Sequence, residues 1–249
     1  MVEHRWNRLT APRLRELAAQ DAVVLLPVGS TEQHGEHLPT GVDDFLATEV
    51  CRRAAALASV PVVVAPSVSC GLAEHHMAFG GTLTLSLSTL HALLRDVCRS
   101  ILRAGFRRIL LVNGHGGNVT ALQALVPELT AELAAPIAVT SYFTAGRTAI
   151  AEVLETQSHL MHACEGETSM ALAAFPELVR TDLLPRAAGP AIALQAEDPA
   201  PVHRFVPFGE TTANGVAGDA RTATADKGAA LLDGCARALA DLLVSLPAT

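Results

Sequence analysis

The sequence predicts an α/β protein: a three-layer α/β/α sandwich built on a mostly parallel sheet. Short apolar runs alternate with longer amphipathic stretches along most of the 249 residues, which is the pattern of parallel βαβ units. Half of the residues are hydrophobic and 17% are charged, so the chain has enough apolar side chains for a large core. We expect a single domain over residues 1–249.

The expected strands are continuous apolar runs, as in strands that are buried on both faces. They are Ala22–Val28, Val60–Ala65, Arg108–Val112 and Ile137–Ser141. The expected helices between and after them are Asp43–Ala58, Thr89–Ala104, Val119–Ala134 and Ala223–Leu246. Asn118 and Thr120 favour a helix start, and Gly105 favours a helix end. Thr181–Ala220 is rich in Pro, Gly and Thr and is expected to form loops with a short hairpin.

Charge and cysteine content exclude several classes of function. The net charge is −7 and no basic cluster is present, which argues against nucleic-acid binding. The five cysteines are scattered and contain no C-x-x-C pair, so we expect reduced thiols. No apolar run reaches the roughly 18 residues of a membrane helix, and the first residues lack the apolar stretch of a signal peptide. We expect a soluble, cytoplasmic protein.

The loop after the first expected strand carries the most informative residues. It reads Gly29-Ser30-Thr31-Glu32-Gln33-His34-Gly35-Glu36-His37-Leu38-Pro39, and Asp43-Asp44 follows. Open α/β sheets bind ligands at this edge, and Glu, His and Asp are ligands of Zn, Mn and Fe. On an extended segment Glu32 and His34 point the same way and could serve two neighbouring ions. Asp43 has two oxygens and could bridge those ions.

Three further clusters, together with this loop, contain most of the histidines. They are Glu74-His75-His76, Asn113-Gly114-His115-Gly116-Gly117-Asn118 and His162-Ala163-Cys164-Glu165-Gly166-Glu167-Thr168-Ser169. The first two follow expected strands, so we expect them to meet the loop described above at one edge of the sheet. His115 is a further candidate ligand, and Glu165 or Glu167 would complete the set. His75 is expected on the substrate side, where Gly116 and Gly117 allow close approach of a ligand.

This chemistry fits a two-metal hydrolase. Two ions about 3.5–4 Å apart hold a bridging hydroxide at neutral pH and polarise a carbonyl for its attack. His162 is then a reasonable general acid for the leaving nitrogen. A dinucleotide loop is excluded because its third glycine position is Val119, and no H-E-x-x-H or G-x-S-x-G motif is present.

Five ordered motifs together resemble the creatininase family of metal-dependent amidohydrolases. They are GSTEQHGEHLPTGVD (Gly29–Asp43), EHHMAFGGT (Glu74–Thr82), LLVNGHGGN (Leu110–Asn118), HACEGETS (His162–Ser169) and NGVAGDARTATADKG (Asn214–Gly228). The resemblance implies an α/β/α fold, two divalent ions and a homo-oligomer, hexameric or larger. It assigns Glu32 and His115 to one metal, His34 to the other and Asp43 as the bridge, with His162 protonating the leaving group.

One departure from the family concerns the third motif. Creatinine-hydrolysing members resemble N-G-H-Y-E-N, in which the Glu binds metal, whereas this chain has Gly116 and Gly117 there. Members with N-G-H-G-G-N typically carry H-A-G-E-x-E-T-S, so Glu165 is the expected replacement ligand and Glu167 is expected to orient a ligand. Cys164 stands in place of the glycine of that motif.

The substrate is less defined than the reaction class. Trp6 and Tyr142 are the only residues of their types, so the tryptophans that pack on creatinine in true creatininases are not expected here. Relatives with the glycine-rich motif include formamide hydrolases and the mycofactocin-precursor peptidase. The leading hypothesis is hydrolysis of a small-molecule cyclic amide or formamide. The alternatives are a peptidase releasing a modified C-terminal dipeptide from a short peptide, a creatinine amidohydrolase proper, and a catalytically silent metal-binding scaffold subunit. The ligand types leave Zn, Mn and Fe(II) open.

Overall fold

A four-stranded sheet forms the middle layer of the computed structural model, which describes residues 2–192, 202 and 204–246. The strands are β1 (Val23–Val28), β2 (Val62–Val64), β3 (Arg108–Asn113) and β4 (Ile137–Ser141). Their order is β2-β1-β3-β4, and all three neighbouring pairs are parallel. The predicted α/β fold class is therefore confirmed.

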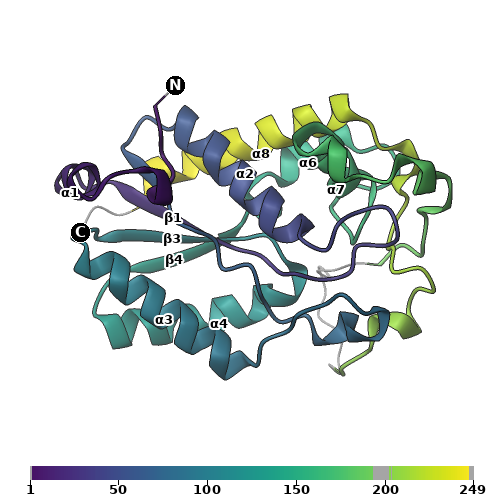
Figure 1. Ribbon diagram of the computed structural model, residues 1–249, viewed down its shortest axis with the longest axis horizontal. Coiled ribbons are helices and arrows are strands. Elements are labelled where there is room, and N and C mark those ends of the chain that lie inside the picture. Colours follow the sequence, from purple (N-terminus) through teal and green to yellow (C-terminus); the bar gives the residue numbers. More distant parts are fainter. Residues whose placement is uncertain (1, 193–201, 203, 247–249) are drawn as a thin grey trace.

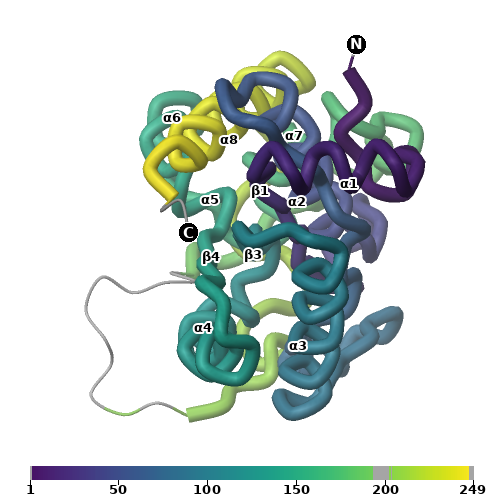
Figure 2. The backbone as a smooth tube through the Cα atoms, turned by 90° about the vertical axis from the view of Figure 1, so that its left-hand side faces the viewer, coloured from purple at the N-terminus to yellow at the C-terminus, as the bar shows by residue number. Residues whose placement is uncertain are grey.

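Helices cover both faces of the sheet (Figures 1 and 2). One layer contains α2 (Val42–Leu57), α5 (Tyr142–Ala145), α6 (Arg147–Val153), α7 (Glu165–Ala174) and α8 (Ala225–Ser245). The other contains α3 (Leu87–Arg103) and α4 (Val119–Leu133), and α1 (Ala11–Ala19) packs at its margin through Leu17.

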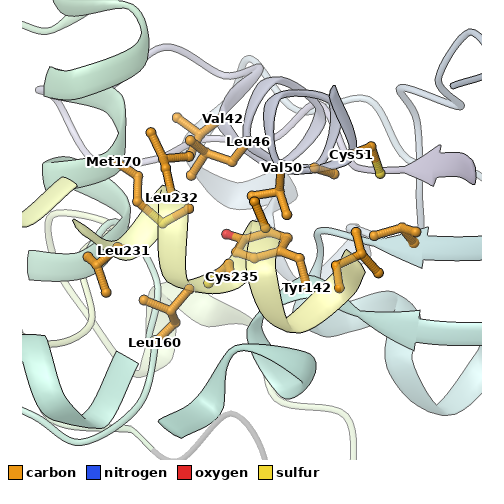
Figure 3. Packing of buried hydrophobic residues seen from close by; sticks show 14 of the residues in the cluster. Val42, Leu46, Val50, Cys51, Tyr142, Leu160, Met170, Leu231, Leu232 and Cys235 are labelled. Carbon is orange, nitrogen blue, oxygen red and sulfur yellow. The ribbon is translucent and has the colours of Figure 1, made fainter. Parts of the chain in front are cut away.

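Alternation along the strands builds two separate cores. In β1, Val23 and Leu25 face the layer of α2 and α8, whereas Val24 and Leu26 face that of α3 and α4. Figure 3 shows part of the first core, where Val50 of α2 and Cys235 of α8 pack with Tyr142. Burial on both faces explains why these strands are continuously apolar.

Side-chain caps set the starts of α3 and α8, which differ from the expected starts by two residues. The side chain of Ser86 accepts the Thr89 N–H, so α3 begins two residues before the expected Thr89. The Thr224 hydroxyl accepts the Lys227 N–H, which starts α8 two residues after the expected Ala223. The sequence analysis did not predict the short helices α1, α5 and α6.

The segment Thr181–Ala220 is irregular, as expected, but its described part forms short 3-10 helices and no hairpin. These helices are Thr181–Arg186, Phe208–Glu210 and Ala220–Thr222, and a single antiparallel bridge joins Ala188 to Asp219. Residues 193–201 and 203 of this segment lie outside the described residues. Among the helices that the structure describes, none has the length and apolar character needed to cross a bilayer.

Candidate metal centre

The loops that follow β1, β2 and β3 meet at one edge of the sheet, as the topology predicts. Asn118 joins all three, because its amide nitrogen donates to the Gly29 carbonyl and its oxygen accepts the Leu72 N–H. Gly29 and Gly114 let these loops reach the first turn of α2: a Cβ on Gly114 would lie 2.4 Å from the Asp43 carbonyl oxygen. This close approach brings Asp43 to the ends of β1 and β3.

Glu32, Asp43 and His115 form the first cluster of candidate ligands. Their ligand atoms all lie within 4.8 Å of one another. His115 Nδ1 lies 3.2 Å from Glu32 Oε2 and 3.0 Å from Asp43 Oδ2. All three side chains are buried. They come from the β1 loop, the start of α2 and the β3 loop, so the three segments contribute one side chain each.

His34 and Glu167 lie on the other side of Asp43. His34 Nε2 is 3.2 Å from Asp43 Oδ1 and 3.9 Å from Glu167 Oε2. His34 Nδ1 lies 3.1 Å from the Glu32 carbonyl oxygen, an orientation in which Nδ1–H donates and Nε2 faces the carboxylates. Asp43 therefore stands between two groups of ligands, in the position expected of a bridge.

Several of these buried atoms lack hydrogen-bond partners. They show whether the residues suit metal ions, because a bound ion would supply the missing partner. Both Glu32 carboxylate oxygens, His34 Nε2 and Asp43 Oδ2 have none among the described residues, although oppositely charged groups are close. An unpartnered buried carboxylate oxygen is costly unless a ligand completes it. Clustered carboxylates and imidazoles are the donor set of Zn, Mn and Fe(II), so the residues fit divalent ions.

The ionisation of the cluster reflects burial and close charges. Burial raises the pKa of Glu32 and raises that of Glu167 to about 8. Burial alone would lower the pKa of His34, but the charge and hydrogen bond of Asp43, together with the charges of Glu167 and Glu32, outweigh it and raise that pKa to about 9. Burial likewise opposes ionisation of Asp43, but His34 and His115 hold its pKa well below the ordinary value. Four acidic and basic side chains thus depend on one another for charge, as expected where cations bind.

Glu165 lies outside this cluster, so its expected role as the fifth ligand is corrected. Its carboxylate is fully buried but accepts hydrogen bonds from Lys227 Nζ at 2.7 Å and from the Thr156 hydroxyl at 2.7 Å. Glu167, two residues further along α7, supplies the carboxylate that faces His34 instead. Successive helix positions are rotated by about 100°, so positions two apart point in very different directions.

Steric contacts explain why the third motif has glycine at position 117. A Cβ on Gly117 would lie 2.4 Å from His115 Nε2 and 2.6 Å from the Leu72 carbonyl oxygen. This backbone therefore excludes a side chain at position 117. Gly116 and the half-buried His75 lie at the same margin of the cluster, where the His75 and His115 rings stack with centroids 5.7 Å apart. This placement is compatible with the expected substrate-side location of His75, Gly116 and Gly117.

His162 lies against the same cluster. Its Nε2 is 2.7 Å from the Gln33 carbonyl oxygen, and its Nδ1 faces Glu32 Oε1 at 3.5 Å. Burial, together with the charge of His34, lowers its pKa well below the ordinary value. When Nε2–H donates to the Gln33 carbonyl oxygen, Nδ1 is unprotonated and faces the Glu32 carboxylate. This neutral form of His162 can accept a proton at Nδ1.

The sequence analysis missed the roles of Gln33 and His76. The Gln33 side-chain oxygen accepts the Gly35 N–H, and its nitrogen lies 2.8 Å from His76 Nδ1 and 3.0 Å from His162 Nε2. His76 Nε2 lies 3.3 Å from Glu32 Oε1. Gln33 stands between Glu32 and His34 in the sequence, a position whose side chain would be expected to point away from theirs. The partners of the Gln33 side chain, His76 and His162, are distant in the sequence, so the local sequence pattern does not indicate these contacts.

Comparisons with known proteins agree with this geometry. The family model described as "Creatininase: Creatinine amidohydrolase" matches residues 7–243. The mycofactocin precursor peptide peptidase of Mycobacterium ulcerans (strain Agy99) is 35% identical over 234 residues, covering 87% of this chain and 84% of that protein. The creatinine amidohydrolase of Pseudomonas putida is 31% identical over 246 residues, covering 91% and 90%.

Solved structures extend the similarity to the whole fold. The structure called "Creatininase Mn" superposes with a TM-score of 0.84 at 29% identity, covering 99% of this chain and 100% of that one. A second structure, of creatinine amidohydrolase (creatininase), gives a TM-score of 0.83 at 29% identity and covers both chains fully. Chains of this similarity share the arrangement of strands and helices described above.

Proposed function

Because this chain belongs to the creatininase family, whose members include metal-dependent amidohydrolases, we propose that it hydrolyses a C–N amide bond in a cyclic amide or formamide, using two divalent ions. The observation that carries the proposal is the group of buried carboxylate and imidazole atoms that face one another without hydrogen-bond partners. Such atoms are stabilised when cations bind between them.

The proposed ligand sets follow from the distances. Glu32, His115 and one oxygen of Asp43 would hold one ion; His34, Glu167 and the other oxygen of Asp43 would hold the second. When bound, two such ions generate a nucleophile from water at neutral pH and polarise the scissile carbonyl. Glu167 replaces Glu165 in this proposal because Lys227 and Thr156 already bind the Glu165 carboxylate.

His162 is the proposed proton carrier. Its unprotonated Nδ1 faces the carboxylate cluster, so it can accept a proton from the attacking water and deliver it to the leaving nitrogen. The hydrogen bond to the Gln33 carbonyl oxygen fixes the ring for both transfers. Phe208 packs against the His162 ring with centroids 5.0 Å apart and restricts its movement.

A peptidase that acts on the modified C-terminus of a short peptide is the second candidate. Relatives named mycofactocin precursor peptide peptidase are 32–35% identical to this chain and match 87–90% of its length. Trp6 supports a substrate other than creatinine, because it packs against Phe106 before the start of β3, whereas His115 and the other candidate ligands gather after the ends of the strands. The preferred substrates are therefore small amides, formamides and short peptides.

The first experiment is metal content per chain, measured on wild type and His34→Ala purified without chelator. Wild type is expected to hold close to two divalent ions and the variant about one. His162→Gln should keep both ions but lower kcat by about 10²–10⁴-fold. A wild type with one ion or none, after dialysis against zinc and manganese, would rule out the two-metal mechanism.

Glu32→Ala separates an enzyme from a metal-binding scaffold subunit. An enzyme should lose hydrolysis, whereas a scaffold should retain its assembly. We also propose a homo-oligomer, hexameric or larger, which light scattering coupled to size exclusion would test. The metal identity, Zn, Mn or Fe(II), follows from the same metal analysis. A cytoplasmic location and a single domain over residues 1–249 stay predictions.

A further inference from the structure

Lys227 is the only lysine in a chain that otherwise uses arginine for its side-chain cations, 18 lysines and arginines in all. It belongs to the fifth motif of the sequence, to which the proposed catalytic residues give no role. Its side chain is only 15% exposed. Because every other long basic side chain is arginine and this one is largely buried, we infer that the site requires the geometry of a lysine ammonium group.

The surroundings of the ammonium group explain this choice. Lys227 Nζ donates to Glu165 Oε1 at 2.7 Å and to the Thr222 carbonyl oxygen at 2.9 Å, and lies 3.1 Å from Glu155 Oε1. Three acceptors match the three N–H groups of an ammonium. The planar fork of arginine suits paired oxygens of one carboxylate instead.

Glu165 links Lys227 to the start of α7. Its second oxygen accepts the N–H and the hydroxyl of Thr156, and both of its oxygens lie 3.2 Å from the Glu155 nitrogen. Glu165 is the first residue of α7, and Glu167 occupies the same turn. The Glu165 carboxylate thus ties the start of α7 to α8 and to the preceding loop.

The residue after Lys227 allows α7 to come close to α8. A Cβ on Gly228 would lie 1.8 Å from the Ser169 carbonyl oxygen, so only glycine fits at this crossing. The Ser169 hydroxyl also accepts the Thr224 N–H at 3.2 Å. Lys227 and Gly228 therefore act on successive turns of α7, Lys227 by binding Glu165 and Gly228 by permitting close contact at Ser169.

We propose that Lys227 is a positioning residue of the metal centre: by binding Glu165 it fixes the first turn of α7 and holds Glu167 opposite His34. This inference rests on the proposed function for its metal readout. It gives Glu165 a role distinct from ligation and assigns a role to the fifth motif. It also concerns one ion only, because the polar partners of the Lys227 ammonium group among the described residues are Glu165, Glu155 and the Thr222 carbonyl, and none of them is on the segments of Glu32, Asp43 or His115.

The test compares Lys227→Met and Glu165→Gln with Arg237→Met, which removes an exposed cation from the same helix. Each protein is stripped of metal and titrated with Zn²⁺ by calorimetry. Loss of a group that orients a ligand typically weakens metal binding by about 10–100-fold. We expect that loss at one of two sites in Lys227→Met and Glu165→Gln, with the other site unchanged, and two wild-type sites in Arg237→Met.

Hydrogen exchange supplies a readout that does not need metal. The Thr168 N–H donates to the Cys164 carbonyl within the first turn of α7. We expect its exchange to accelerate in Lys227→Met, whereas amides in the middle of α2 should exchange as in wild type. A variant that merely lowers global stability would accelerate exchange in both helices.

Two results would overturn the inference: wild-type affinity at both Zn²⁺ sites in the folded variants, or unchanged exchange at Thr168. Should Lys227→Met fail to fold, Glu165→Gln decides, because its amide oxygen still accepts from Thr156. A wild type that binds fewer than two ions contradicts the proposed function. The exchange measurement alone then decides the role of Lys227.

Discussion

At the residue scale, the candidate ligands gather around the Asp43 carboxylate, which faces His34 with one oxygen and His115 with the other. Spacing and loop position suggested Glu32, His34, Asp43 and His115, and the structure brings these four together. The choice between Glu165 and Glu167 depended on how α7 is rotated, which contacts from α8 determine. Such contacts join residues 62 positions apart and cannot be inferred from the local pattern.

His37 gives a prediction for the pH dependence of stability. Burial, assisted by the charge of His34, lowers the pKa of His37 to about 4, while an unfolded histidine has a pKa near 6.5. The unfolded state therefore binds the extra proton first, and stability is lost as the pH falls below about 6.5. Relative to His37→Gln, wild type should lose about 1.4 kcal/mol per pH unit between pH 6 and 4.

Urea unfolding of metal-free protein at several pH values measures this difference. Glutamine at position 37 can keep the contact that His37 Nε2 makes with the Thr168 hydroxyl at 2.9 Å, so the comparison isolates the ionisation. Parallel pH profiles for the two proteins would show that His37 titrates in the folded state as it does in the unfolded state.

At the scale of elements, the parallel strands were predictable and the packing of α7 on α8 was not. Apolar runs and the loops between them specify β1 to β4 because such strands are buried on both faces. The crossing of α7 and α8 depends instead on Gly228. Only the three-dimensional contact with Ser169 shows that no side chain fits at position 228.

Gly228→Ala should destabilise the protein despite the better helix propensity of alanine. Propensity favours alanine by about 1 kcal/mol, whereas overpacking typically costs about 1–3 kcal/mol and here the contact is with main chain that cannot move aside. Because this main chain cannot yield, we expect the upper end of that difference, a net loss of about 2 kcal/mol in the free energy of unfolding. Gly209→Ala is the matched control, since its Cβ would meet Ala78 at an ordinary 3.5 Å. Equal stability of the two variants would contradict this account of the crossing.

At the scale of the whole molecule, one edge of one sheet gathers the candidate ligands from segments distant in sequence. β2, β1 and β3 are neighbours and parallel, so the loops after them meet without any long-range signal in the sequence. The topology was therefore sufficient to predict where the candidate ligands gather. It was not sufficient to predict Gln33 and His76, whose roles depend on side-chain packing between those loops.

Metal removal should lower the stability of the entire chain, because the ligands join both the sheet edge and two helices. Ions that bind only the folded state add about 2.7 kcal/mol at a free concentration one hundred times the dissociation constant. Chelator should lower the Tm, and Zn²⁺ should restore it. Glu32→Ala is expected to show a smaller response, from the ion that His34, Glu167 and Asp43 hold, and a chelator-insensitive wild-type Tm would exclude structural coupling of this kind.

Gly117 also has a consequence for how the family diverged. The creatinine-hydrolysing pattern places a metal-binding glutamate at this position, but here its Cβ would overlap His115 and the Leu72 carbonyl. Substitution of glutamate alone would displace the His115 side chain, a proposed ligand, before it supplied a new carboxylate. Moving between the two patterns therefore requires a prior shift of the loop that carries Leu72. In this backbone, a glutamate at position 117 therefore needs at least one further change, in the loop that carries Leu72.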